Sequence, residues 1–153
     1  MEKTFYTIKA IRENFLKLIS DLSIESLNEI PEGFNNNIIW NLGHIIASQQ
    51  IICYELTDNI PLIESQYISD YRNGTKPERF INNTELEVMK SNLLSTIDRT
   101  EIDLLNNLFE NFKVKQLQLG LKLERIQDSL NYVPVHDATH LGYSLALKRI
   151  IKH

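Results

Sequence analysis

Two histidines near the end of the chain have a spacing that suits a metal ion. His136 and His140 stand four residues apart in the segment VHDATHLG. Residues four apart on a helix lie on the same face, one turn removed, so the two imidazoles can bind one ion. The same pair also fits two core histidines whose hydrogen bonds are satisfied within the protein. A metalloprotease is disfavoured, because Asp137 occupies the place of the glutamate in the HExxH motif.

A third histidine strengthens the metal hypothesis. His44 lies in the segment WNLGHI, within a second stretch of helical periodicity, and a helical bundle can bring it to the other two histidines. Three nitrogen ligands leave a position open for water or substrate, which is typical of catalytic rather than structural metal sites. The fourth histidine, His153, is the last residue, and we expect it in a frayed, solvent-exposed tail.

Four further residues are candidates for supporting roles. Tyr143 lies near the histidine face and can donate a proton or orient a ligand. Cys53 is expected to be a buried structural thiol rather than a nucleophile. Asp137 points about 100° away from His136 on a helix, so it is expected to be solvated or to support a ligand indirectly. Trp40 is expected in packing, in a subunit interface or at the mouth of a pocket.

Helical periodicity predicts four main helices that position these residues. Thr84 is the expected N-cap of the third helix, with Glu87 completing a capping box. Pro134 is expected to interrupt or kink the fourth helix. The four helices are predicted to cover about 4–20, 37–56, 84–109 and 123–152. The inward positions of the third helix are predicted to be Leu86, Met89, Leu93, Ile97, Leu104, Leu105 and Leu108.

The connections complete an all-α four-helix bundle, expected as a single domain over residues 1–153. Residues 57–83 form a long crossover between the second and third helices, with a short helix expected around 66–72. A connection of this length can cover a site. Residues 111–122 alternate polar with apolar side chains, which indicates a short extended segment or hairpin.

A homodimer is predicted from apolar positions that face away from the expected core. On the second helix these form a separate outer stripe, and two residues of the fourth helix are grouped with them. The six positions are Trp40, Ala47, Ile51, Tyr54, Leu141 and Leu145. Gly142 and Ala146 are expected to let a neighbouring helix approach closely.

Composition excludes several classes of function. The chain has 153 residues and a net charge of −4 with scattered basic residues, which argues against nucleic-acid binding. No stretch approaches the roughly 18 consecutive apolar residues of a membrane-spanning helix. The lone Cys53 cannot form an internal disulfide, and the first residues lack the apolar run of a signal peptide. A cytoplasmic location is therefore expected.

Two motifs together give the chain a family resemblance. The segments FNNNIIWNLGHI and HDATHLGYSLALKR, separated by the long crossover, make it similar to the DinB-like superfamily along essentially its whole length. The resemblance implies a four-helix bundle, usually dimeric, in which three histidines bind a divalent metal. Matched residue by residue, these ligands are His44, His136 and His140.

The resemblance implies an activity less specifically than a fold. Relatives include transferases that use a low-molecular-weight thiol such as bacillithiol, and a mycothiol-dependent maleylpyruvate isomerase. The favoured hypothesis is therefore a metal-dependent S-transferase or hydrolase acting on a small-molecule substrate, with Zn, Ni, Fe, Co or Mn as the ion and a thiol as cosubstrate. The alternative is a non-catalytic dimeric module for metal binding or stress response.

Overall fold

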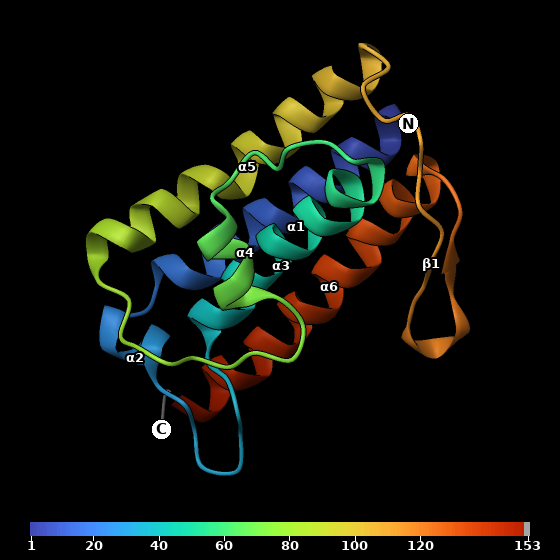
Figure 1. Cartoon of the computed structure of the whole chain (residues 1–153). Coiled ribbons are helices and arrows are strands. Elements are labelled where there is room, and N and C mark those ends of the chain that lie inside the picture. The colour runs from blue at the N-terminus through green and yellow to red at the C-terminus, as the bar shows by residue number, and fades with distance from the viewer. Residues whose placement is uncertain (152–153) are drawn as a thin grey trace.

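The computed structural model describes residues 1–151 and is mostly helical (Figure 1). The predicted all-α class is confirmed, and the expected tail residue His153 lies outside the described part. The four long helices are α1 (Glu2–Ser20), α3 (Ile38–Cys53), α5 (Asn83–Leu105) and α6 (Ile126–Ile151). The short helices are α2 (Ile24–Asn28), η1 (Glu55–Thr57), α4 (Ser65–Tyr71) and η2 (Gln118–Gly120). The predicted hairpin is present as β1 (Lys115–Gln116) paired antiparallel with β2 (Lys122–Leu123).

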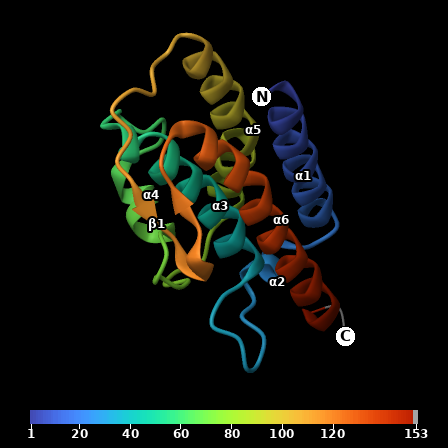
Figure 2. The same cartoon turned by 90° about the vertical axis from the view of Figure 1, so that its right-hand side faces the viewer.

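The four long helices pack side by side around a shared core. Both α1 and α3 contact α5 and α6, so each long helix has two long neighbours (Figures 1 and 2). The crossover between α3 and α5 carries η1 and α4, and α4 packs against α3. The short helix expected around 66–72 is therefore confirmed. Within residues 1–151, no helix combines the length and apolarity that crossing a bilayer requires.

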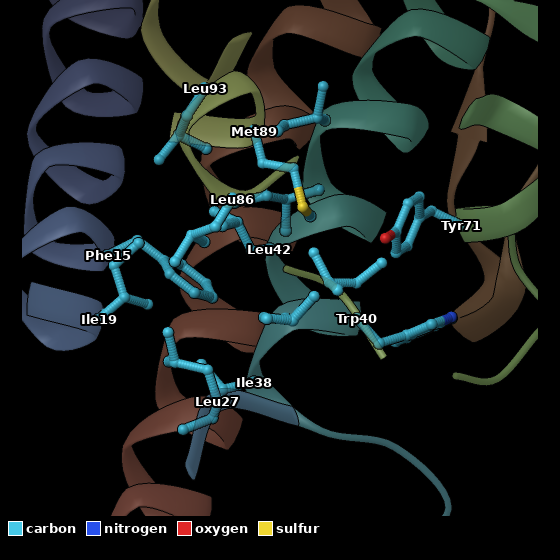
Figure 3. Close-up of a cluster of buried hydrophobic side chains, with 14 of the residues drawn as sticks. Phe15, Ile19, Leu27, Ile38, Trp40, Leu42, Tyr71, Leu86, Met89 and Leu93 are labelled. Carbon is cyan, nitrogen blue, oxygen red and sulfur yellow. The ribbon is translucent and has the colours of Figure 1, made fainter. Parts of the chain in front are cut away.

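Periodic apolar side chains build the core as the sequence predicts. The stripe of α1 is buried at Phe5, Ile8 and Phe15, and α5 contributes Met89 and Leu93. Figure 3 shows side chains of α1 meeting those of α3 and α5, with Trp40 and Tyr71 on the side away from α1. The core therefore extends to α4, the short helix that packs against α3.

The outer stripe of α3 is buried within the chain, so the prediction that it forms a subunit interface was wrong. Trp40, Ala47 and Tyr54 are each at most 6% exposed. The Trp40 indole donates to the hydroxyl of Thr75 in the crossover, and the Tyr54 hydroxyl donates to Asp103 of α5. Periodicity showed that two faces are buried but could not tell that the crossover and α5 cover the second one.

The remaining residues assigned to that interface do not form a matching apolar face. Ile51 and Leu141 are half-buried within the chain, and Leu145 is exposed. The close-approach role of the small pair on α6 was also wrong. A methyl group added at Gly142 would meet nothing within 4 Å, and Ala146 is exposed. Homodimerisation itself stays a prediction.

The long helices differ from the predictions in their limits and continuity, most clearly in α5 and α6. α6 continues through Pro134, so the helix is not interrupted there, and the alternative expectation of a kink stays a prediction. α5 begins two residues early, because Asn82 rather than Thr84 is the N-cap, and Glu85 rather than Glu87 completes the capping box. α5 also ends at Leu105, before the expected Phe109, and Leu105 and Leu108 are exposed rather than inward.

Replacing Asn82 with Ala tests the observed cap. The Asn82 side chain accepts from the backbone N–H of Glu85, so its loss leaves a helix-terminal donor without its partner. We expect the free energy of unfolding to fall by about 0.5–2 kcal/mol in urea denaturation followed by circular dichroism. Thr84→Ala is the control and should change it by less than about 0.5 kcal/mol. A larger loss of stability in Thr84→Ala than in Asn82→Ala would instead indicate that Thr84 is the N-cap.

Candidate metal site

The three predicted histidines lie together between α3 and α6. The His44 ring centre is 5.0 Å from that of His136 and 4.6 Å from that of His140, and the rings of His136 and His140 are 4.6 Å apart. One nitrogen of each ring can be chosen such that all three nitrogens lie within 4.8 Å of one another. The structure therefore brings together, from two helices, the residues that sequence spacing selected.

His44 is oriented by the helix that covers it. Its Nδ1 lies 2.7 Å from the backbone carbonyl oxygen of Tyr71, the last residue of α4. A carbonyl oxygen only accepts, so Nδ1 carries the proton and Nε2 keeps the lone pair, to which the Ser48 hydroxyl donates at 3.3 Å. The indole of Trp40 stacks on the imidazole at 4.7 Å with an angle of 11° between the rings. These two contacts fix both the ring plane and the tautomer of His44.

His140 is oriented by an amide of the facing helix. Its Nδ1 lies 2.7 Å from Oδ1 of Asn41, one turn before His44 on α3. The Asn41 amide nitrogen donates to the carbonyl of Asn37, which places Oδ1 toward the histidine. Nδ1 of His140 is therefore the donor, and its Nε2 is free. Hydrogen bonds to the distal ring nitrogen are typical of metal-ligating histidines.

Among the residues that the structure describes, His136 is the member of the trio without such a contact at hydrogen-bond distance. Its Nδ1 lies 3.8 Å from Oδ1 of Asp137, and its ring centre is 5.7 Å from that of Tyr132. Its side chain is 15% exposed, whereas His44 is 5% exposed as a whole residue. The cluster is therefore reachable from solvent on the His136 side.

Burial keeps two of the imidazoles neutral. Desolvation lowers the pKa of His44 to about 4, and the neighbouring His136 acts in the same direction. Desolvation also lowers the pKa of His140 to about 3, assisted by the charges of His136 and His44. A metal ion binds the neutral imidazole, so at neutral pH both rings are in the binding form without losing a proton.

The donor set fits a divalent ion. Bonds of about 2.0–2.1 Å place two nitrogens on a tetrahedral Zn²⁺ about 3.3 Å apart, so rotation of the three side chains can close the set around an ion. Imidazole nitrogen suits Zn, Ni, Fe and Co, and the order of affinities alone does not choose among them. Three ligands from the chain leave the coordination sphere open.

A small cavity adjoins the cluster through shared residues. It has a volume of about 190 Å³ and is lined by Trp40 and Tyr71, which also contact His44. Charged side chains of both signs complete it, including Asp70, Lys76 and Arg79. None of the three histidines is part of its lining, so Trp40 and Tyr71 are the link between the cavity and the cluster.

A buried ion pair lies beside the histidines. Nε of Arg12, on α1, donates to Oδ2 of Asp137 at 2.8 Å, and the two side chains are 0% and 1% exposed. The expectation of a solvated Asp137 was therefore wrong. Helical geometry predicted the direction of the Asp137 side chain relative to His136. It could not predict that Arg12 of α1 lies in that direction.

The other two candidates have different environments. Cys53 is fully buried, and burial raises the pKa of its thiol to about 12, which confirms the structural reading. Tyr143 is 37% exposed, with its ring 6.0 Å from that of Phe34 in an edge contact. Among the contacts of residues 1–151, none joins Tyr143 to a histidine ring, so its catalytic role stays a prediction.

Three groups that orient or neighbour the cluster were missed from the sequence. Asn41 and Arg12 carried a usable signal, since each is a polar residue on the buried stripe of an apolar helix. The Tyr71 carbonyl carried no such signal, because any residue supplies a backbone carbonyl. Only the path of the crossover places it over His44.

Replacing Gly43 with Ala tests how closely α4 must approach. A methyl group at Gly43 would lie 2.3 Å from Cδ1 of Tyr71, so α4 would have to move, taking with it the carbonyl that orients His44. We expect a fall of about 1–3 kcal/mol in the free energy of unfolding in urea. Gly142→Ala is the matched control, because its methyl group would meet nothing within 4 Å. Equal stability of the two variants would contradict the close contact.

The lowered pKa values predict how stability depends on pH. Without metal, the unfolded chain takes up protons at His44 and His140 below pH 6.5, whereas in the folded protein these pKa values are about 4 and 3. The stability contributed by burying neutral rings is thus complete above pH 6.5 and is lost as the pH falls toward 4.

Urea unfolding in chelator from pH 7.5 to 4.5 measures this dependence. His140→Gln removes one of the two groups and should flatten the slope between pH 6.5 and 4.5. An identical slope in the variant would show that His140 titrates normally in the folded protein.

Comparison with known proteins identifies the family of the chain. A search of curated proteins found no match to the chain. The family model of the DinB superfamily matches residues 7–144, a span that includes all three histidines, the whole of α3 and α6 as far as Ser144. Because this match covers most of the chain, the protein belongs to the DinB superfamily.

Proposed function

We propose that the protein is a metal-dependent enzyme whose ion is held by His44, His136 and His140. The observation that carries this proposal is the convergence of the three rings, with Nδ1 of His44 and of His140 engaged at 2.7 Å by Tyr71 and Asn41. Hydrogen bonds of this kind prepare Nε2 for a metal.

The number of ligands favours catalysis over a structural role. Structural zinc sites are closed by four protein ligands, whereas catalytic sites use three. No fourth histidine, cysteine or carboxylate is grouped with the trio among the described residues. The partial exposure of His136 supports access for a small molecule on that side.

The reaction we favour is transfer of a low-molecular-weight thiol to a small electrophilic substrate. A divalent ion at this site would lower the pKa of a thiol or water that binds it, which supplies a nucleophile near neutral pH. The adjoining cavity of about 190 Å³ is smaller than the usual ligand pocket of roughly 300–1,000 Å³ and therefore favours a small molecule. Its mixture of Asp70, Lys76 and Arg79 favours a polar one.

Turnover with defined thiols tests this function. Protein stripped with chelator and reloaded with Zn, Ni, Mn, Fe or Co is assayed with a panel of thiols and a chromogenic electrophile. We expect turnover that requires metal and is lost in His136→Ala, while Thr139→Ala, an exposed change between the paired histidines, retains it. Metal binding without turnover in any combination would favour the non-catalytic module instead.

Tyr143→Phe tests the proposed proton-transfer role of this side chain. Only the hydroxyl is removed, and the ring that meets Phe34 is kept. A positioned proton donor contributes about 10²–10⁴-fold to a rate, so kcat should fall by that factor with metal affinity unchanged. A kcat within twofold of the wild type would remove Tyr143 from the mechanism.

A further inference from the structure

The Asp137 carboxylate has one oxygen in use and one without a partner. Oδ2 accepts from Nε of Arg12 at 2.8 Å. Oδ1 is buried and has no hydrogen-bond partner among the described residues. A buried carboxylate oxygen without a partner is costly, because it has lost its water and gained nothing in exchange. A hydrogen-bond donor to Oδ1 of Asp137 would remove this cost.

A candidate donor is His136, one of the three proposed metal ligands. Nδ1 of His136 lies 3.8 Å from Oδ1, about 1 Å beyond hydrogen-bond distance. Within residues 1–151, His136 is also the histidine of the trio whose Nδ1 has no hydrogen-bond partner, whereas Nδ1 of His44 and of His140 each have one at 2.7 Å. An acceptor and a ring nitrogen that both lack a hydrogen-bond partner among the described residues thus lie 3.8 Å apart at the edge of the cluster.

We propose that Asp137 is a positioning residue that accepts the Nδ1 proton of His136 when Nε2 of His136 binds the metal. This inference rests on the proposed metal site. The expected change is a small rotation of the imidazole that shortens the 3.8 Å separation to a hydrogen bond. A carboxylate in this position fixes the tautomer of the ligand and raises its basicity.

Arg12 holds the carboxylate in place from the opposite side. It is fully buried on α1, and besides Asp137 it donates to the carbonyl of Leu93 on α5 and, at 3.4 Å, to that of Ile45 on α3. One guanidinium therefore connects all four long helices, and its partner on α6 is the residue next to His136. The orientation of this ligand is thereby tied to the packing of the bundle.

Metal affinity of Asp137→Asn tests the proposal. The variant is compared with Asp103→Asn, which alters a second buried carboxylate that accepts from an arginine Nε at the same distance of 2.8 Å. Dissociation constants for Zn and Co are measured by competition with a chromophoric chelator at pH 7.5. We expect Asp137→Asn to weaken binding by about 10–100-fold and Asp103→Asn to leave it within threefold.

The wild-type protein provides a second measurement that does not depend on folding of a variant. In the zinc-loaded protein, nitrogen NMR of the imidazoles should show His136 protonated at Nδ1 and bound through Nε2. Binding through Nδ1 would overturn the proposal, as would unchanged affinity in Asp137→Asn. Failure of the wild type to bind any metal would instead overturn the proposed metal site on which this inference rests.

Discussion

Removing any one of the three histidines should abolish tight metal binding. His44, His136 and His140 each supply one nitrogen, and two remaining imidazoles form a weaker chelate. Loss of an outer hydrogen-bond partner costs about 10–100-fold in metal affinity, so loss of a direct ligand should cost at least that much. We expect each Ala variant to show a dissociation constant raised by about 100-fold or more in chelator competition.

Thr139→Ala is the matched control for the histidine variants. Thr139 is exposed and lies between His136 and His140 on α6, where its hydroxyl donates to the backbone carbonyl of Val135 in its own helix. Its affinity for metal should equal that of the wild type within about threefold. An Ala variant at any of the three histidines that binds as tightly as this control would remove that histidine from the ligand set.

Arg12→Met should be among the most destabilising single substitutions in the chain. It leaves the Asp137 carboxylate buried without its cation and removes the donor shared by α3, α5 and α6. Breaking a buried ion pair from one side costs about 3–5 kcal/mol. We expect a loss of that size in the free energy of unfolding, measured by urea denaturation in chelator.

Two comparisons separate the ion pair from a general effect of losing an arginine. Arg125→Met removes a side chain that is 73% exposed and should change stability by less than about 0.5 kcal/mol. The double variant Arg12→Met/Asp137→Leu removes both charges and should recover part of the loss, because no uncompensated charge stays buried. A double variant no more stable than Arg12→Met would show that lost packing, not the unpaired charge, dominates.

The three histidines of the candidate metal site could be selected from the sequence because their grouping depends largely on local geometry. The spacing of His136 and His140 places both on one helical face, and His44 lies within another helix of apolar periodicity. Neither inference required knowledge of how the helices pack, beyond the assumption that two buried faces meet. The fold class followed from the same periodicity.

The surroundings of the ligands depend on packing that periodicity does not encode. The outer stripe of α3 was correctly judged apolar, but whether Trp40 meets a second subunit or the crossover depends on the path of residues 57–83. The environment of Asp137 was equally hard to predict, since its partner Arg12 is 125 residues away in the sequence. The Tyr71 carbonyl could be placed only by the fold.

The most direct test of the metal site is the melting temperature of chelator-treated protein with and without added Zn, Ni or Mn at pH 7.5. At free metal about a hundred times the dissociation constant, binding adds about 2.7 kcal/mol to stability, which for a chain of this size is a shift of roughly 5–10 °C. We predict such a shift in the wild type and its absence in His140→Ala. Identical melting curves of the wild type with chelator and with every metal would contradict the three-histidine site.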